Sequence, residues 1–302
     1  MDKTIYNIEN RGYPIIGHWF FLMLAGLLDI TKGNPIEGSN CPVYNCSRLN
    51  HNVFDRNIKI NGKIKICFYN QIIDEGTTWK SQGGFSNFNF ETLNLISDKF
   101  ELITDINKYK NEGYQIINNY GCVINNNHNY PFVKVENIEF VRNLFLENTN
   151  YEYNNKKYIY ISRKKAITCK NSPSFNLNRR TILNEDTLFD NYLSKLGFNI
   201  VYLEDYSVEN KIKLFNTSSI IVSPFGGAFT FTIFANKNTN IIEISSNFKC
   251  VGWYGQWEQI TRMLNIPYLK IHANNMDNMD NMIVNETELY NKINDIIHNK
   301  QN

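Results

Sequence analysis

The sequence predicts an α/β protein with a parallel sheet, because strand-like and helix-like segments alternate between residues 158 and 244. Segments with helical periodicity lie between the strand-like runs, and two glycines precede the helix that follows the third run. Strands that alternate with helices at this spacing form parallel sheets, whose ligands lie at the carboxyl ends of the strands. The four runs are rich in β-branched and aromatic residues and occupy 157–163, 198–203, 219–223 and 240–244.

The first half of this stretch contains a strand that ends in a cation and a helix that begins with carboxylates. The strand at 157–163 delivers Arg163 to its carboxyl end. Asn184, Glu185 and Asp186 then open a helical pattern that stops at Gly197. A short amphipathic helix at 209–215 leads to the third strand.

The third strand ends in a glycine-rich turn at 223–228, followed by a predicted helix at 229–235. Residues without side chains let backbone N–H groups approach an anion at the positive end of a helix, and a diphosphate fits that description. The alternative is that Gly226 and Gly227 only make a tight left-handed turn. The turn is not G-x-G-x-x-G, and the chain has no P-loop Gly-Lys-Ser/Thr, so ordinary dinucleotide and ATP sites are unsupported.

Together these segments resemble glycosyltransferase family 61, and Gly17-His18-Trp19 is similar to the His-Trp helix that opens the family's first domain. The resemblance covers nearly the whole chain and is densest over 158–244. It implies a GT-B-like α/β fold, with two Rossmann-like domains facing each other across a cleft. It also implies inverting transfer of a sugar from a UDP-sugar donor to a glycan or protein hydroxyl. The segments that carry it are Arg163, 180–185, 197–198, 212–215, 223–230, 234–235 and 242–243.

Four positions depart from the family's pattern. The turn of the family usually reads His-Gly with an Asn a few residues on, and Phe225 and Phe231 stand in those places. Leu22 replaces a carboxylate that commonly follows His-Trp, and Ser218-Ser219 replaces an Asp before the third strand. Phenylalanine cannot form side-chain hydrogen bonds. The alternative function is therefore a catalytically inactive family member that binds a glycan or a nucleotide.

Candidate donor-binding residues follow from the chemistry of the leaving diphosphate. Arg163 and Arg180 suit it, because a planar guanidinium binds phosphate oxygens through two donors; the alternative is surface ion pairing. Glu243 is expected to end the fourth strand and to accept the ribose hydroxyls, or else to form a salt bridge. Glu185 either joins this site or only complements the helix dipole. The resemblance adds four residues of the turn to the donor site: Ser223, Gly226, Gly227 and Ala228.

The best candidate for the general base is His18, because imidazole titrates near neutrality. A lone His on an apolar helix is also often a satisfied core residue. Asp74 and Glu75 are alternative bases with only loop position in their favour. No Asp-x-Asp stands near a strand end, so we expect a metal-independent mechanism, with no metal site and no tightly bound cofactor.

Composition bounds the domain count and the partners. The chain has 302 residues, 42% of them hydrophobic, enough for two domains, which we place at 1–150 (acceptor side) and 151–302 (nucleotide-sugar side). The polar, Asn-rich stretch 148–155 marks the boundary. The net charge of +2 provides no basic face for nucleic acid. The expected partners are a nucleotide-sugar donor and a glycan or glycoprotein acceptor.

The cysteines and the apolar run at 15–30 bear on the compartment. Six cysteines lack zinc-site spacing, and Cys41 and Cys46 are close enough for a disulfide. The run at 15–30 is shorter than the ~20 apolar residues that span a bilayer. We expect a buried helix there, with a signal peptide as the alternative. A cytoplasmic location is favoured, and the secretory lumen remains open if 15–30 is a signal or anchor.

The rest of the chain has weaker patterns. Residues 63–68 are expected to form a strand, and 90–102 a mostly helical amphipathic segment. Short strands at 115–117 and 122–124 precede a helix at 135–146. The Asn-Met-Asp repeat at 275–282 is expected to be a loop. A final helix at 286–297 is expected to pack back onto the body.

Overall fold

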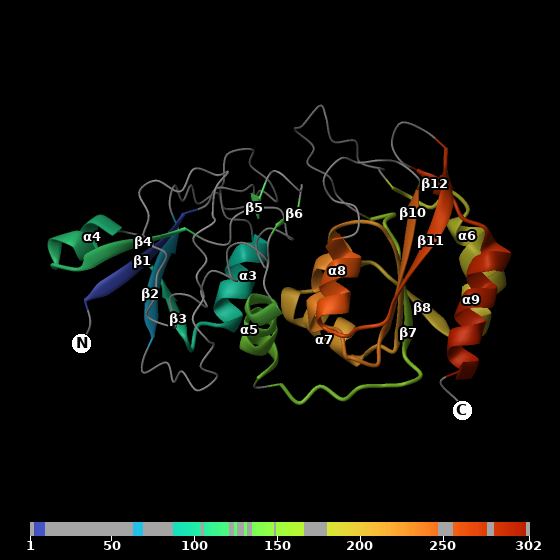
Figure 1. Cartoon of the computed structure of the whole chain (residues 1–302), viewed down its shortest axis with the longest axis horizontal. Coiled ribbons are helices and arrows are strands. Elements are labelled where there is room, and N and C mark those ends of the chain that lie inside the picture. Colours follow the sequence, from blue (N-terminus) through green and yellow to red (C-terminus); the bar gives the residue numbers. More distant parts are fainter. Residues whose placement is uncertain are drawn as a thin grey trace. The chain divides into compact units, whose positions relative to one another are not determined.

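The computed structural model describes parts of two compact units (Figure 1). The described residues of the N-terminal unit lie within 1–149, and those of the C-terminal unit within 150–302. The residues described are 3–9, 63–68, 87–103, 106–120, 124–125, 130–131, 135–147, 149–165, 180–246, 256–276 and 281–299.

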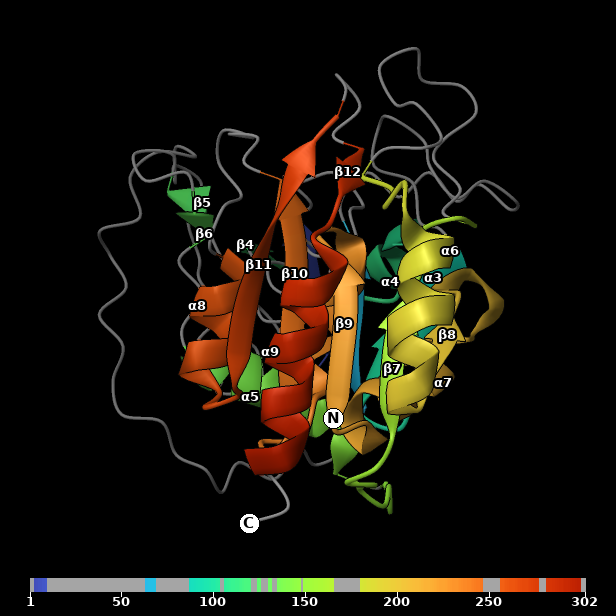
Figure 2. The ribbon, with the colours of Figure 1, turned by 90° about the vertical axis from the view of Figure 1, so that its right-hand side faces the viewer.

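The C-terminal unit is built on a six-stranded sheet in the order β12-β11-β10-β9-β7-β8 (Figure 2). All neighbouring strands are parallel except β12, which pairs antiparallel with β11. The predicted α/β class with a parallel sheet is thus confirmed. The strands are β7 Tyr158–Ile161, β8 Phe198–Val201, β9 Ile220–Pro224, β10 Asn240–Ser246, β11 Tyr268–Asn275 and β12 Met282–Ile283.

The strand order reverses at β7. The chain runs from β7 to its neighbour β8 on one side, and then crosses back to β9 on the other side of β7. From β9 it continues outward through β10 and β11. In open parallel sheets, ligands bind beyond the carboxyl ends of the two strands at such a reversal. A ligand-binding site is therefore expected at the carboxyl ends of β7 and β9.

Helices cover both faces of this sheet (Figure 1). One face carries α6, its continuation through a π turn and a 3₁₀ turn (η2 and η3), and α9; the other carries α7, the 3₁₀ helix η5 and α8. Gly197 ends the first of these helical stretches in the left-handed region, with φ 83°. The bounds are α6 Glu185–Leu188, η2 Phe189–Leu193, η3 Ser194–Leu196, η4 Leu203–Asp205, α7 Val208–Thr217, η5 Gly227–Phe234, α8 Gln256–Met263 and α9 Glu286–Asn299.

The two faces of the sheet differ in character. The face under α6 and α9 is an apolar core, because alternate residues of each central strand bring a hydrophobic side chain to it. The face under η5 and α8 also carries buried polar groups, among them Ser223 and Glu243, which are register partners on β9 and β10. The core residues include Tyr160, Leu188, Ile220, Val222, Ile242, Ile244, Ile271, Leu289 and Ile293.

Several elements of this unit differ from the prediction, and the strand expected at 198–203 ends at Val201. The helix expected at 229–235 is a 3₁₀ helix that begins earlier, at Gly227. The strand expected at 240–244 continues to Ser246, because β11 pairs with it as far as Ala273. The expectation that Glu243 ends its strand was therefore wrong, since three residues of β10 follow it. The partner strand β11 was not recognised in the sequence.

The N-terminal unit contains a four-stranded parallel sheet in the order β3-β2-β1-β4. The expected helix at 135–146 is confirmed as α5, but the helix expected through 102 ends at Leu95, because 100–102 pairs with β2 as a strand. Ile5 and Ile66 are fully buried. The bounds are β1 Thr4–Glu9, β2 Ile64–Phe68, α3 Asn87–Leu95, β3 Phe100–Leu102, α4 Ile106–Asn111, β4 Gln115–Tyr120, β5 Ile124–Asn125, β6 Tyr130–Pro131 and α5 Val135–Leu146.

Several predictions fall outside the described residues. They are the apolar run at 15–30 and the cysteine pair Cys41 and Cys46. Among the helices that the structure does describe, none has the length and apolar character needed to cross a membrane.

Candidate functional site

Arg163 and Gly226 meet at the reversal point of the sheet. Arg163 lies two residues beyond the end of β7, and Gly226 two residues beyond the end of β9. A β-carbon at Gly226 would overlap Nη1 of Arg163 and would lie 3.2 Å from its Cζ. The backbone of Gly226 is extended, with φ 167° and ψ −167°. The alternative of a left-handed turn is therefore wrong for this residue, and the Arg163 guanidinium occupies the space that a side chain here would take.

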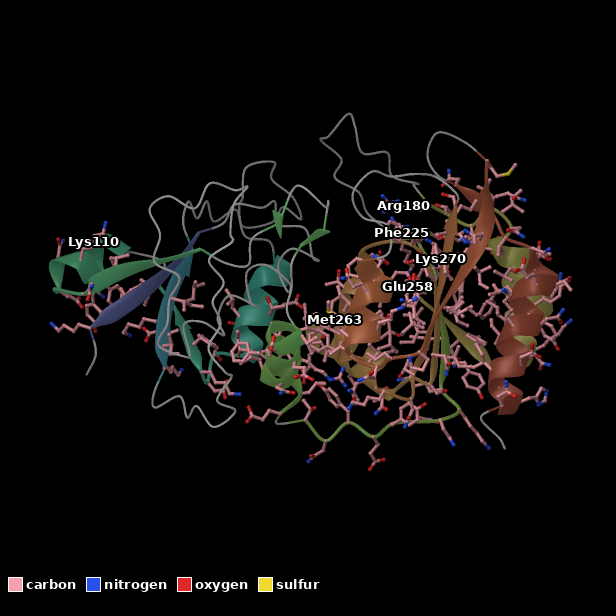
Figure 3. The ribbon with its side chains drawn as sticks, in the orientation of Figure 1. Lys110, Arg180, Phe225, Glu258, Met263 and Lys270 are labelled. Atoms are coloured by element: carbon pink, nitrogen blue, oxygen red, sulfur yellow. The ribbon has the colours of Figure 1, made fainter. Side chains whose placement is uncertain are left out.

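Arg180 and Phe225 form a second contact beside the first. The guanidinium Cζ of Arg180 lies 5.0 Å from the centroid of the Phe225 ring, within the range of a cation–π interaction (Figure 3). The N–H of Phe225 donates to the carbonyl of Ile244 at 2.8 Å, which ties the turn to β10. Two guanidinium groups thus lie against consecutive residues of one turn.

Two lysines that follow Arg163 are engaged with carboxylates. Lys164 pairs with Asp186, and its Nζ lies 3.6 Å from Glu185. Lys165 pairs with Asp205 at 2.6 Å and lies over the ring of Tyr202. The hydrogen bond to Asp186 is the main reason that the pKa of Lys164 is raised. These lysines therefore hold α6 and η4 near the end of β7.

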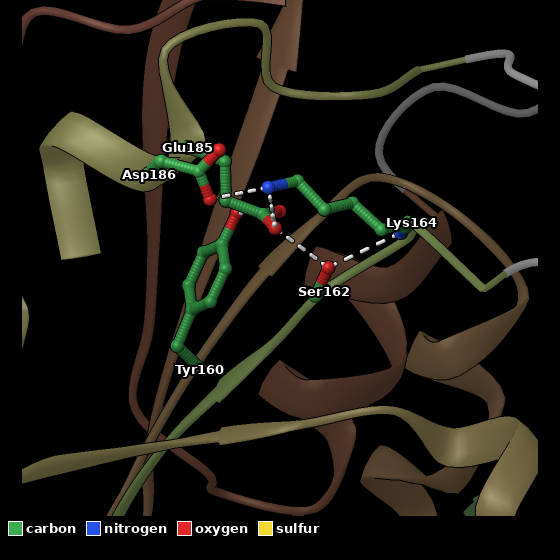
Figure 4. Close-up of polar contacts among 5 residues, drawn as sticks. All are labelled: Tyr160, Ser162, Lys164, Glu185 and Asp186. Atoms are coloured by element: carbon green, nitrogen blue, oxygen red, sulfur yellow. Dashed lines mark hydrogen bonds and ion pairs between the residues drawn. The ribbon is translucent and has the colours of Figure 1, made fainter. Parts of the chain in front are cut away.

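Glu185 lies under the end of β7 and is 1% exposed. Its carboxylate accepts hydrogen bonds from Tyr160 at 2.8 Å and from Ser162 at 2.7 Å (Figure 4). Ser162 Oγ in turn accepts a hydrogen bond from the backbone N–H of Lys164 at 3.1 Å. Burial, followed by the charge of Glu185, raises the pKa of Tyr160 well above its ordinary value. This network fixes the backbone on both sides of Arg163.

Glu243 lies on the face of the sheet under η5 and α8, and is 2% exposed. It accepts a hydrogen bond from Tyr268, and Nζ of Lys270 lies 3.6 Å from it. Both partners come from β11, where Lys270 is the register partner of Glu243. Burial is the main cause that raises the pKa of Glu243, against the hydrogen bond from Tyr268 and the charge of Lys270, which lower it. The same burial, together with Glu243, raises the pKa of Tyr268.

The raised pKa of Glu243 predicts a pH dependence of stability. The folded state binds the proton of Glu243 more tightly than the unfolded state does. The resulting contribution to the free energy of unfolding is therefore fully present below the ordinary pKa of 4.5, and it is lost as the pH rises through the raised pKa. Glu243→Gln should remove this loss. In urea unfolding between about pH 4 and about pH 7, the wild type should lose stability relative to Glu243→Gln. Glu288→Gln, on the exposed side of α9, is the control, and parallel profiles for wild type and Glu243→Gln would contradict the assignment.

The remaining residues of the turn have different surroundings. Ser223 is buried and donates to the carbonyl of Pro224 at 3.0 Å. Gly227 is exposed at the start of η5, and a β-carbon there would meet no atom within 4 Å. Ala228 is half-buried in the first turn of η5. Of the two glycines, only Gly226 thus has another side chain in the space that a β-carbon would take.

Three of the residues that depart from the family pattern, Phe231, Ser218 and Ser219, have structural roles in this unit. Phe231 is 2% exposed and packs against Phe215 at 5.8 Å and Phe234 at 6.3 Å between ring centroids. Ser218 donates to the carbonyl of Leu214 at 2.7 Å, and Ser219 to that of Asn155 at 2.9 Å. Phe231 thus packs η5 against α7, Ser218 closes the end of α7, and Ser219 links the start of β9 to the segment before β7.

The candidate bases His18, Asp74 and Glu75, and also Leu22, lie outside the described residues. In the ranges that are described, no group of three or more His, Cys, Asp or Glu side chains could hold a metal ion.

Sequence reasoning missed three contributors to this region. Tyr268 and Lys270 stand two residues apart, so a strand assignment for 268–275 would have placed them on one face of a strand, although not beside Glu243. Phe225 was counted only as a lost hydrogen bond, because no pattern in the sequence pairs it with Arg180.

The fold and this edge of the sheet define a class of protein, an α/β protein with cationic side chains at a strand-order reversal. Comparison with known families then specifies it: the family model described as Glycosyltransferase 61 matches residues 16–242, well over half of the chain. The chain therefore belongs to glycosyltransferase family 61, and membership implies a sugar donor and an acceptor. A search of curated proteins finds no match to the chain.

Proposed function

We propose that this protein is an inverting glycosyltransferase that moves a sugar from a UDP-sugar donor to a hydroxyl of a glycan or protein. The observation that carries the proposal is the contact of Arg163 with Gly226 at the carboxyl ends of β7 and β9. A guanidinium held at this edge suits a diphosphate, because its planar fork of donors matches phosphate oxygens. Membership of glycosyltransferase family 61 indicates that the diphosphate belongs to a sugar donor.

The donor site that we propose comprises the turn and the arginines around it. Arg163 and Arg180 stabilise the negative charge that develops on the departing UDP. Gly226 lets the turn approach the diphosphate, and the backbone N–H groups of Gly227 and Ala228, which a change of side chain leaves in place, donate to it. Glu185 and Ser223 support this site from beneath, since their polar groups are engaged within the chain.

Glu243 has a more specific place in the proposal. It lies one strand from the turn, in register with Ser223, and its carboxylate is held by Tyr268 and Lys270. We therefore propose that Glu243 binds the ribose hydroxyls together with Tyr268 and Lys270. Tyr268 and Lys270 are half-buried, so a ribose would be met by a connected set of polar groups and not by one carboxylate.

The chemistry of the proposed step is a single displacement. A base takes the proton of the acceptor hydroxyl, and the oxygen then attacks the anomeric carbon from the side opposite the diphosphate. The bond to the diphosphate oxygen breaks, and UDP leaves with its charge stabilised by the two guanidinium groups. We assign the base to His18. In the corresponding GT-B arrangement, the N-terminal unit binds the acceptor and the C-terminal unit the donor.

Incubation of the full-length protein with a panel of UDP-sugars, with and without EDTA, tests this function. We expect UDP release from one of them, stimulated by an acceptor glycan and unchanged by EDTA, because arginines take the place of a cation at the leaving group. Inverted anomeric configuration in the product is the second expected result. Strict dependence on manganese would contradict the mechanism, and UDP binding without turnover would favour the inactive, nucleotide-binding alternative.

A further inference from the structure

Phe225 borders the proposed donor site, although its side chain has no polar group. Its ring lies under the guanidinium of Arg180, with 5.0 Å between Cζ and the ring centroid. Both side chains are half-buried. Phe225 directly precedes Gly226, whose missing side chain makes room for Arg163.

Stacking on an aromatic ring orients a guanidinium without neutralising it. The negative face of the ring attracts the cation. This contact uses the flat face of the guanidinium, whereas its N–H donors lie in the plane and point sideways. The ring therefore orients Arg180 in a way that suits the binding of an anion.

Both partners of this contact have fixed backbones. Phe225 N–H donates to Ile244 on β10 at 2.8 Å. Arg180 has φ 61°, in the left-handed region that is uncommon for residues other than glycine. The residues directly after Arg180 are hydrogen-bonded to β12 and to Asn281, which precedes β12. Thr181 N–H donates to Asn281 Oδ1 at 3.0 Å, and the Thr181 carbonyl accepts from Met282 N–H at 2.9 Å. Leu183 N–H donates to the Met282 carbonyl at 2.8 Å.

We propose that Phe225 is a positioning residue that acts through Arg180: its ring holds the guanidinium in the orientation in which it binds the diphosphate of the donor. This inference rests on the proposed function, because it assumes that a nucleoside diphosphate binds at the turn. Pre-orientation matters since a free arginine side chain loses rotamer freedom on binding, and a stacked one has already lost part of it. Phe225 thus raises affinity without contacting the ligand.

A double-mutant cycle with UDP as the probe tests the inference. Phe225→Leu keeps an apolar side chain but removes the ring, and should weaken UDP binding by about three- to tenfold. Phe225→Trp should retain the affinity, because its ring attracts cations at least as well. In an Arg180→Ala background, Phe225→Leu should have no further effect. Titration calorimetry on the full-length variants gives the four dissociation constants.

Phe231→Leu is the matched control, because Phe231 lies six residues along the chain in the core with Phe215 and Phe234. It should lower the melting temperature and leave UDP affinity unchanged. Equal losses from Phe225→Leu with and without Arg180 would show that Phe225 does not act through Arg180, and a silent Phe225→Leu would likewise overturn the inference. Absence of UDP binding in the wild type would overturn the proposed function itself, which distinguishes the two failures.

Discussion

Gly226→Ala is expected to weaken UDP binding about ten- to hundredfold, because a methyl group at this position would take the space of the Arg163 guanidinium. The backbone is not the obstacle, since Gly226 is extended and alanine adopts that conformation readily. The atoms that must move are the end of a flexible side chain. The variant should therefore fold normally, with Arg163 displaced from the turn.

Gly227→Ala is the matched control for this prediction. The two glycines are neighbours, but a β-carbon on Gly227 would meet no atom within 4 Å. Gly227→Ala should thus bind UDP nearly as well as the wild type. Thermal shifts and titrations with UDP on both variants give the comparison. Equal losses at the two positions would mean that contact with Arg163 is not what makes Gly226 necessary.

Glu185→Ala should lower the free energy of unfolding of the C-terminal unit by about 3 kcal/mol. The substitution leaves the hydroxyls of Tyr160 and Ser162 without their acceptor in a buried site, and removes the carboxylate near Lys164. Glu185→Gln should cost less, because an amide oxygen still accepts one of these bonds. Unfolding in urea, monitored by hydrogen exchange at the amides of β7, separates this effect from unfolding of the N-terminal unit.

Asp186→Asn provides the control for Glu185. Asp186 is the next residue and also pairs with Lys164, but its side chain is 83% exposed. Exposed ion pairs contribute little, so Asp186→Asn should change stability by less than about 0.5 kcal/mol. If Glu185→Ala were as mild as Asp186→Asn, Glu185 would not hold the end of β7.

Local patterns in the sequence were sufficient for the elements around the turn. Apolar, β-rich runs between helical segments identified β7 and β9. A helical pattern ending at Gly197 identified the segment that begins with α6. The position of Arg163 follows directly, because a residue after a parallel strand lies at the carboxyl edge of the sheet. This much requires only local periodicity and stop signals.

Contacts between distant segments could not be obtained in this way. Nothing in the sequence indicates that Arg180 stacks on Phe225, or that Tyr268 and Lys270 hold Glu243. The reason for Gly226 also differs from the one expected, since glycine was weighed as a backbone residue and not as space for Arg163. The length of β10 likewise depends on its pairing with β11. Each of these features is a tertiary contact that propensity does not encode.

The most direct test of the donor site is calorimetric titration of UDP into the wild type, Arg163→Ala and Lys165→Ala. Both variants remove one positive charge beyond β7, but Arg163 lies against Gly226 of the turn, whereas Lys165 pairs with Asp205. The donor-site proposal predicts saturable binding to the wild type, an affinity about 30- to 100-fold lower for Arg163→Ala, and little change for Lys165→Ala. Equal affinity of Arg163→Ala and the wild type would contradict the placement of the diphosphate between β7 and β9.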